Sequence, residues 1–160
     1  MRRKMNNEDS KKEGSRFFFE LATPRDMLEK ARREHRRLTE RFHVDNVFNF
    51  FVTAYHIKDY IQHNSSVSQV TWETFLKDPD MQDCHNLCDK GKHLILTQKN
   101  RSNPATHMIS GCYGGAPFGT IPWGGCGKWV LITNGREVDV ESLAKRVLEK
   151  WDVFFEEHGL

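Results

Sequence analysis

The sequence predicts a mainly α protein: a bundle of four to five helices with a small antiparallel β-hairpin or sheet inserted before the C-terminal helix. Three observations support this fold class. Apolar residues recur at helical spacing in two long runs early in the chain and in one at its end. Before that last run, Asn134-Gly135 separates two short extended runs, a pattern typical of a β-hairpin. The 160 residues are enough for one domain with a sizeable core.

The first helix is expected to begin at Pro24, with Thr23 as its N-cap and Asp26 closing the cap. One face is apolar apart from a single histidine: Met27, Leu28, Ala31, His35, Leu38 and Phe42. The opposite face carries charged residues: Arg33, Glu34, Arg37, Glu40 and Arg41. Its three arginines are the candidate nucleic-acid-binding residues, because guanidinium groups contact phosphates.

The second helix is expected over residues 46–63, with Asp45 as its N-cap. Its apolar stripe is Val47, Phe50, Phe51, Ala54, Ile57 and Ile61. A separate polar stripe, with Asp59 beside it, comprises Asn46, Asn49, Thr53, His56, Tyr60 and His63. Solvent-facing stripes are usually rich in Lys and Glu, whereas this one is mostly uncharged and hydrogen-bonding. Its composition favours a lined groove.

A short third helix is expected within 70–76, and a fourth runs from about residue 80 to residue 97. The core stripe of the fourth helix includes Cys84 and Cys88, and Gly91 is expected to allow close approach of another backbone. The polar flank carries His85, Asp89, Lys92 and His93. The cysteine spacing does not match a zinc knuckle, so buried, reduced thiols are expected, with no metal or cofactor.

The glycine-rich segment 111–127 is interpreted as a flap, since it lacks both nucleotide-binding fingerprints. The expected hairpin pairs 129–133 with 136–140, and residues 105–110 form a candidate third strand. The final helix, over 140–158, has a broad apolar face: Leu143, Ala144, Val147, Leu148, Trp151, Phe154 and Phe155.

Charge is unevenly distributed along the chain. Residues 1–42 hold 13 Lys and Arg against 8 Asp and Glu, whereas the remaining residues hold 11 against 14. A basic first quarter suits contact with a polyanion such as RNA, although a solvated helix face would look the same. Residues 1–15 are expected to form a disordered basic arm ahead of one domain at 16–160. Without a membrane span or secretory signal, a cytoplasmic protein is expected.

The residues that could carry chemistry are divided between the second and fourth helices. His56 and Asp59 stand three positions apart, where a hydrogen bond could fix the imidazole tautomer. Lys92 and His93 could supply charge stabilisation and a general acid. These four are the candidate catalytic residues, and the polar groove beside them is expected to include Asn49, Thr53 and Asp89. The alternative is an ordinary solvated helix surface.

The two helices FNFFVTAYHIKDYI and CHNLCDKGKHLIL resemble those of a widespread, poorly characterised family of small bacterial and phage helical proteins. That family pairs an N-F-x-V-T-A-x-H-x-x-D helix with a later helix ending in K-H, and the resemblance covers residues 43–155. The plan also resembles HEPN domains, dimeric helical bundles that cleave RNA without a metal. No Arg precedes His93 at the spacing of the HEPN motif, and Asp89 stands where the family has Asn.

The resemblance implies an RNA-directed protein, either an RNA-binding protein or a metal-independent ribonuclease of a bacterial or phage defence or counter-defence system. It also implies a homodimer as a candidate oligomeric state. The alternative interpretation is a non-enzymatic protein-interaction module, such as a phage or mobile-element accessory protein that binds a host protein through its glycine-rich flap and aromatic surface.

Overall fold

The computed structural model describes residues 18–93, 104–109, 128–133 and 135–160. The expected basic arm, 1–15, and the expected glycine-rich flap, 111–127, therefore lie outside the described residues. None of the described helices combines the length and the apolar character that crossing a membrane requires.

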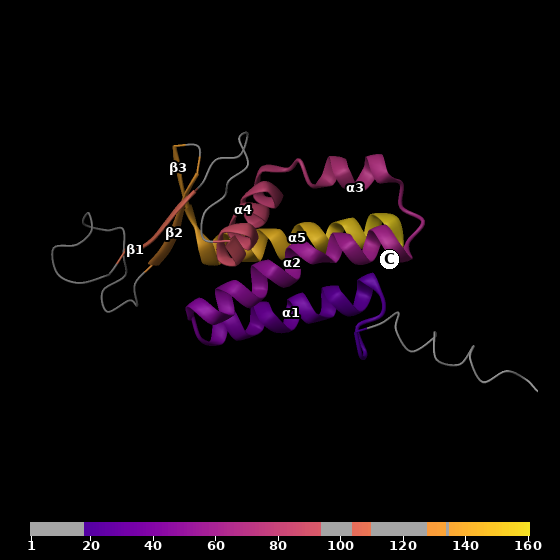
Figure 1. Ribbon diagram of the computed structural model, residues 1–160, viewed down its shortest axis with the longest axis horizontal. Helices are drawn as coiled ribbons and strands as arrows, with labels where there is room; N and C mark the ends of the chain where they lie inside the picture. The colour runs from indigo at the N-terminus through magenta and orange to yellow at the C-terminus, as the bar shows by residue number, and fades with distance from the viewer. Residues whose placement is uncertain (1–17, 94–103, 110–127, 134) are drawn as a thin grey trace, which may run out of the picture.

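The mainly α fold class is confirmed, with five helices and a three-stranded antiparallel sheet in the described part of the chain. The helices α1, α2 and α5 form the body, α3 and α4 lie over it, and the sheet lies at one end (Figure 1). The elements are α1 (Pro24–Glu40), α2 (Val44–Asn64), α3 (Gln69–Phe75), α4 (Pro79–His93), β1 (Ala105–Ile109), β2 (Lys128–Thr133), β3 (Arg136–Asp139) and α5 (Val140–His158).

The N-terminus of α1 forms as the sequence predicts. The Thr23 side chain accepts a hydrogen bond from the Asp26 backbone N–H, and the Asp26 carboxylate accepts one from the Thr23 N–H at 2.8 Å. The predicted cap of α2 is wrong by two residues. His43, not Asp45, is the N-cap, and its Nδ1 accepts from the Asp45 N–H at 3.3 Å. An imidazole can cap a helix, and the helix therefore begins earlier than a search for Asp, Asn, Ser or Thr suggests.

The sheet has the order β1-β2-β3, with both pairs antiparallel. Leu131 at its centre lies opposite Thr106 on one side and Val138 on the other. Gly135 has a φ of +72°, a left-handed conformation that glycine adopts readily and that a hairpin turn requires. The predicted hairpin and its third strand are therefore confirmed.

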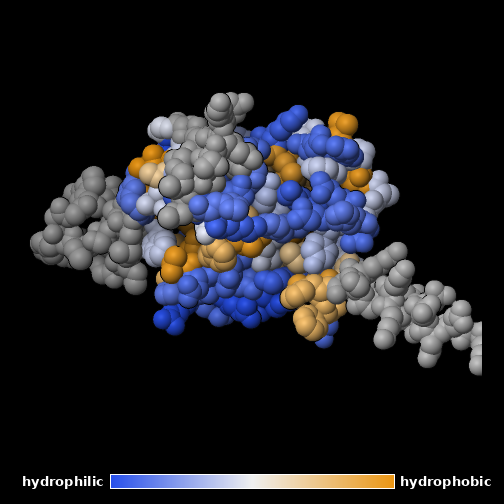
Figure 2. Space-filling view, viewed as in Figure 1, coloured by the Kyte–Doolittle hydropathy of each residue, from blue (hydrophilic) through white to orange (hydrophobic). Residues whose placement is uncertain are grey.

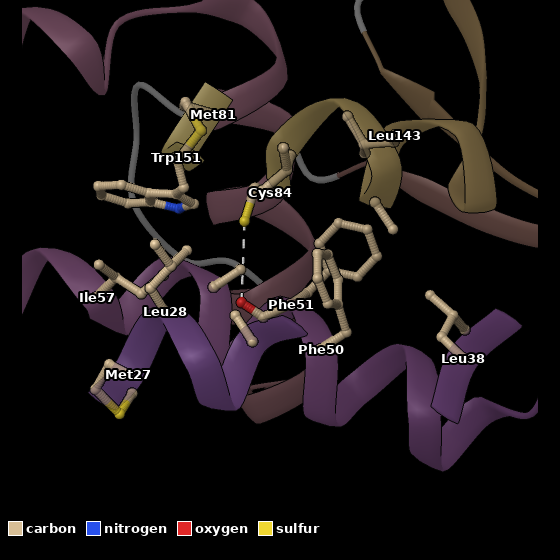
Figure 3. Packing of buried hydrophobic residues seen from close by; sticks show 14 of the residues in the cluster. Met27, Leu28, Leu38, Phe50, Phe51, Ile57, Met81, Cys84, Leu143 and Trp151 are labelled. Atoms are coloured by element: carbon tan, nitrogen blue, oxygen red, sulfur yellow. Dashed lines mark hydrogen bonds between the residues drawn. The ribbon is translucent and has the colours of Figure 1, made fainter. Parts of the chain in front are cut away.

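The core is packed where α1, α2, α4 and α5 meet (Figure 3). Phe50 and Phe51 of α2 and Trp151 of α5 are fully buried there. The Cys84 thiol points at the Phe51 carbonyl, with 3.9 Å between sulfur and oxygen, as the dashed line in Figure 3 marks. This contact joins α4 to α2, so the expected packing of these two helices as neighbours is correct.

Two expectations about individual side chains are wrong. Glu34 is buried rather than on the charged outer face, because its Oε1 accepts from both Lys30, at 3.0 Å, and Arg37, at 2.9 Å. Gly91 makes room for the Phe48 ring rather than for another backbone: a Cβ placed on Gly91 would lie 2.8 Å from Phe48 Cδ2.

Candidate functional site

The polar stripe of α2 lines an open groove between α1 and α4. The groove has a volume of about 450 Å³, within the range of small-ligand sites. We call it the polar groove, and its lining residues are Phe18, Leu21, Met27, Lys30, Asn49, Val52, Thr53, His56, Asp59, Tyr60 and Lys92. The predicted members Asn49, Thr53, His56, Asp59 and Lys92 thus lie around one groove.

The central contact joins His56 of α2 to Lys92 of α4. Lys92 Nζ lies 2.7 Å from His56 Nε2, and His56 Nδ1 lies 2.7 Å from the Val52 carbonyl oxygen. A carbonyl can only accept a hydrogen bond and an ammonium can only donate, so these partners assign the tautomer. Nδ1 carries the hydrogen, and Nε2 presents its lone pair to the ammonium.

Lys30 brings a second ammonium into the polar groove from α1. Its Nζ donates to Thr53 Oγ1 at 2.9 Å and to Glu34 Oε1 at 3.0 Å. Thr53 is buried by this contact. The sequence reasoning missed Lys30, although Lys30, Glu34 and Arg37 are separated by three or four positions and therefore share one stripe of α1.

Asp59 lies in the polar groove but does not orient His56. The expected hydrogen bond between them does not form, because each group has another partner. Asp59 Oδ1 lies 3.3 Å from Lys58 Nζ, and His56 Nδ1 lies 2.7 Å from the Val52 carbonyl oxygen. A helical carbonyl one turn earlier is the nearer partner for Nδ1. The tautomer is therefore fixed by the backbone of α2 rather than by a carboxylate.

Asp89 and His93 do not line the polar groove. Asp89 Oδ2 lies 3.2 Å from His85 Nε2, and the His85 ring stacks on Tyr55 at 4.0 Å between centroids. His93 is exposed at the end of α4 and makes no hydrogen bond or ion pair with another described residue. Of the four candidate catalytic residues, His56, Asp59 and Lys92 therefore line the polar groove, whereas His93 does not.

The three arginines predicted to bind nucleic acid are exposed on α1 and at its C-terminal cap. Arg37 is paired with Glu34 at 2.9 Å, whereas Arg33 and Arg41 form no ion pair with a described residue. Asn46 of α2 donates to the carbonyls of Arg37 and Arg41, at 3.2 and 2.8 Å, so the arginine end of α1 adjoins the polar stripe of α2. Figure 2 shows hydrophilic residues along the lower edge of the molecule, where Figure 1 places α1.

The two described cysteines are poorly suited to nucleophilic chemistry. Cys88 Sγ lies 3.9 Å from His56 Nδ1, but burial raises the pKa of its thiol, and Lys92 only partly opposes this effect. Burial also raises the pKa of Cys84 well above its ordinary value. Both are free thiols, and the described residues contain no group of three or more His, Cys, Asp or Glu able to hold a metal ion.

A second depression lies on the sheet side of α2 and α4, with a volume of about 440 Å³. We call it the apolar hollow. Its lining residues are Val44, Val47, Phe48, Phe51, Leu87, Lys90, Gly91, Thr106, His107, Trp129, Val130 and Val140. Phe48 and Val44 are partly exposed at it. The sequence reasoning did not identify this depression, because it depends on the docking of the sheet against two helices.

No family model matches the chain, and no curated protein or solved structure is significantly similar to it. The fold and the site therefore define a class by themselves: a mainly helical protein with a small antiparallel sheet and a polar groove containing an ammonium–imidazole pair. The likeness to HEPN domains is one of general plan drawn from the sequence alone, so the function must be argued from the polar groove.

Proposed function

We propose that this chain is an RNA-directed protein that holds phosphates of the RNA backbone in the polar groove and along the arginines of α1. The observation that supports this most directly is the contact of Lys92 with His56. A neutral imidazole does not neutralise the positive charge of the ammonium, as a carboxylate would. A phosphate can therefore approach Lys92 without displacing an acidic partner.

The arrangement of cations extends this argument beyond one phosphate. Lys30 of α1 and Lys92 of α4 both line the polar groove, Arg37 lies on the same stripe of α1 as Lys30, and Arg41 lies at the C-terminal cap of that helix. A row of cations that follows a helix edge can contact successive phosphates of one strand. The proposed setting is cytoplasmic, in a bacterial or phage defence or counter-defence system, as the sequence resemblance implies.

Binding is the form of the proposal that the geometry supports best. Metal-independent cleavage would use the Nε2 lone pair of His56 to take the proton of a ribose 2′-hydroxyl, while Lys92 neutralises charge on the attacked phosphate. Among the described residues, no second imidazole lines the polar groove to protonate the leaving oxygen. Cleavage of a labelled RNA in EDTA by the wild-type chain, lost in His56→Ala, would establish the catalytic form.

The test of binding is a salt titration with a fluorescently labelled RNA. Four phosphate contacts predict that log K falls with log salt with a slope of roughly −3. Arg33→Gln combined with Arg41→Gln should reduce this slope by about 1 to 2 without unfolding the chain, because neither guanidinium pairs with a described residue. Lys77→Gln combined with Lys145→Gln, which removes two exposed cations elsewhere, is the matched control. Affinity that does not change with salt would contradict the proposal.

The apolar hollow favours a second candidate function, a non-enzymatic protein-interaction module. Phe48 is 41% exposed and Val44 48% exposed there, beside the sheet. Partly exposed aromatic residues over an apolar depression are typical of protein contacts. A homodimer is one such contact: light scattering should then give twice the chain mass, and Phe48→Asp should return the protein to a monomer.

A further inference from the structure

The mouth of the polar groove carries a pair of exposed aromatic rings. Phe18 is 67% exposed and Phe19 is 88% exposed, and their rings meet edge to face at 5.0 Å between centroids. Phe18 also lines the polar groove, together with Tyr60 and the cations Lys30 and Lys92. Figure 2 shows this apolar patch at the end of α1 where the chain enters the helix.

The backbone holds these rings outward in a strained turn. Phe19 has a φ of +52°, the left-handed region that a bulky residue rarely adopts. The turn is closed by the Leu21 N–H, which donates to the Phe18 carbonyl at 3.0 Å, while Leu21 packs against the core. Burial does not account for this arrangement, because the strained residue exposes its ring. Strain of this kind is typical of functional positions.

We infer that the polar groove selects single-stranded RNA, with an unpaired base stacked on Phe18 and Phe19 while the neighbouring phosphate lies against Lys92 and Lys30. This inference rests on the proposed function and adds the substrate class to it. Bases in a duplex are stacked on one another and cannot reach a protein ring, whereas single strands are held by aromatic platforms beside cationic grooves.

The cations of the polar groove favour single-stranded RNA over a protein segment as its ligand. A protein segment that covered two exposed phenylalanines would bury Lys92 beside them and would have to neutralise it, because no carboxylate of the described residues pairs with Lys92, whereas Lys30 already pairs with Glu34 at 3.0 Å. A single strand supplies an apolar base face and a phosphate charge within one nucleotide, and the lining of the polar groove contains both an aromatic ring, Phe18, and the cations Lys30 and Lys92. The volume of about 450 Å³ also matches the range for small-ligand sites, as one nucleotide requires.

The test compares a labelled single strand with a blunt hairpin duplex that has the same number of phosphates. The wild-type chain should bind the single strand more tightly, and Phe18→Ala with Phe19→Ala should weaken single-strand binding roughly tenfold while leaving duplex binding unchanged. Phe19→Trp should keep the affinity, since it keeps a stacking surface. Val70→Ala, at another exposed apolar residue on α3, is the control.

A 2-aminopurine base in the single strand gives a second readout. Its fluorescence should fall on binding to the wild-type chain and recover in the double alanine variant. Equal affinity for the two RNAs, unaffected by the alanine substitutions, would overturn this inference and leave the proposed function intact. Absence of binding to either RNA would overturn the proposed function and the inference with it. Circular dichroism confirms that the variants fold.

Discussion

The charged side chains in the two halves of α4 have different partners. In the first half, each carboxylate meets a cation of α5 or β3: Asp80 lies 2.9 Å from Arg146 and Asp83 lies 3.0 Å from Arg136, and Asp78, directly before α4, lies 2.8 Å from Lys150. In the last turn, Lys92 meets the imidazole of His56 at 2.7 Å, and no carboxylate of the described residues pairs with it.

This contrast separates structural charge from charge available to a ligand. The carboxylates of the first half are engaged by cations of the same chain, so they hold elements together and attract nothing from outside. The ammonium of Lys92, in contrast, is held in position by the neutral imidazole of His56, which does not balance its charge. A phosphate can therefore pair with Lys92 in the polar groove, whereas the cations at the α4–α5 contact are already paired with carboxylates.

The largest effect is expected at Asp80. Arg146 makes two-pronged contact with its carboxylate, through Nε at 3.2 Å and Nη2 at 2.9 Å, and Lys150 lies at 3.7 Å. Asp80→Asn should lower the free energy of unfolding by about 2 kcal/mol, since charge-assisted hydrogen bonds are lost on both cations. Urea unfolding at neutral pH measures this loss, and RNA affinity should stay unchanged.

The stability of wild type and Asp80→Asn at acid pH provides the control for this prediction. Burial acts to raise the pKa of this carboxyl, but Arg146 and Lys150 hold it below the ordinary value of 3.8. Its contribution to stability is therefore present above pH 3.8 and disappears as the pH falls through the lowered folded value. The difference between wild type and Asp80→Asn should shrink in that range. A constant difference would show that the lost stability is not electrostatic.

Lys92→Gln tests the other half of α4. Glutamine can still donate to His56 Nε2 but carries no charge, so RNA affinity should fall about tenfold, or about 1.4 kcal/mol. The melting temperature should stay within a degree or two, because Lys92 is exposed. Fluorescence anisotropy at a fixed salt concentration measures the affinity. If Lys92→Gln unfolded the chain instead, the ammonium would be structural and the contrast along α4 would fail.

His35 is a third case, a buried polar group with no partner. Its Nε2 is buried without a hydrogen bond to a described residue, and the ring meets Phe50 edge-on at 5.6 Å between centroids. His35→Leu should stabilise the fold by about 1 kcal/mol, since an unsatisfied polar atom is removed. Thermal unfolding at pH 7 measures the gain, and a clear loss would mean that the imidazole has a hydrogen-bond partner outside the described residues.

The pH dependence of His35 gives an independent readout. Burial lowers its pKa below 6.5, although Glu141 and Glu149 of α5 oppose the shift and Lys145 supports it. The folded chain favours the neutral ring, so wild-type stability should decline as the pH falls below 6.5 toward the lowered folded value. His35→Leu should flatten the curve in this window alone.

Much of the fold could be predicted because its signals are local. The capping box at Thr23, the hairpin of β2 and β3 and the apolar face ending at Phe155 each depend on residues within a few positions of one another. The N-cap of α2 was misplaced because an imidazole accepted the hydrogen bond that Asp45 was expected to accept. Glu34 was misplaced because its burial depends on two cations gathered around one oxygen.

The candidate site could be predicted only in part, because a site depends on which elements meet. Helical spacing on α2 was enough to group Asn49, Thr53 and His56 on one stripe. It could not give the contribution of Lys30, which reaches the groove from α1, nor show that Lys92 rather than His93 turns toward His56. One position along a helix rotates a side chain by about 100°, and packing against α2 decides which residue faces inward.

The smallest effect is expected at Asp83, although it is the most buried carboxylate of α4. Its side chain is only 3% exposed, and burial raises its pKa above 3.8 against the opposing charge of Arg136. The charged form is therefore costly in the folded chain, and the contribution of Asp83 is favourable below pH 3.8 and is lost as the pH rises through the raised folded value.

Asp83→Asn keeps an oxygen that can accept from Arg136 and removes the buried charge, and Arg136 is 53% exposed and can be hydrated. At neutral pH the substitution should change the free energy of unfolding by less than about 0.5 kcal/mol, well below the loss in Asp80→Asn. On acidification the difference between wild type and Asp80→Asn should shrink, whereas wild type should gain stability relative to Asp83→Asn, since the two pKa values are shifted in opposite directions. A neutral-pH loss at Asp83 larger than that at Asp80 would show that burial, rather than the number of cations that meet a carboxylate, decides what each charge on α4 contributes.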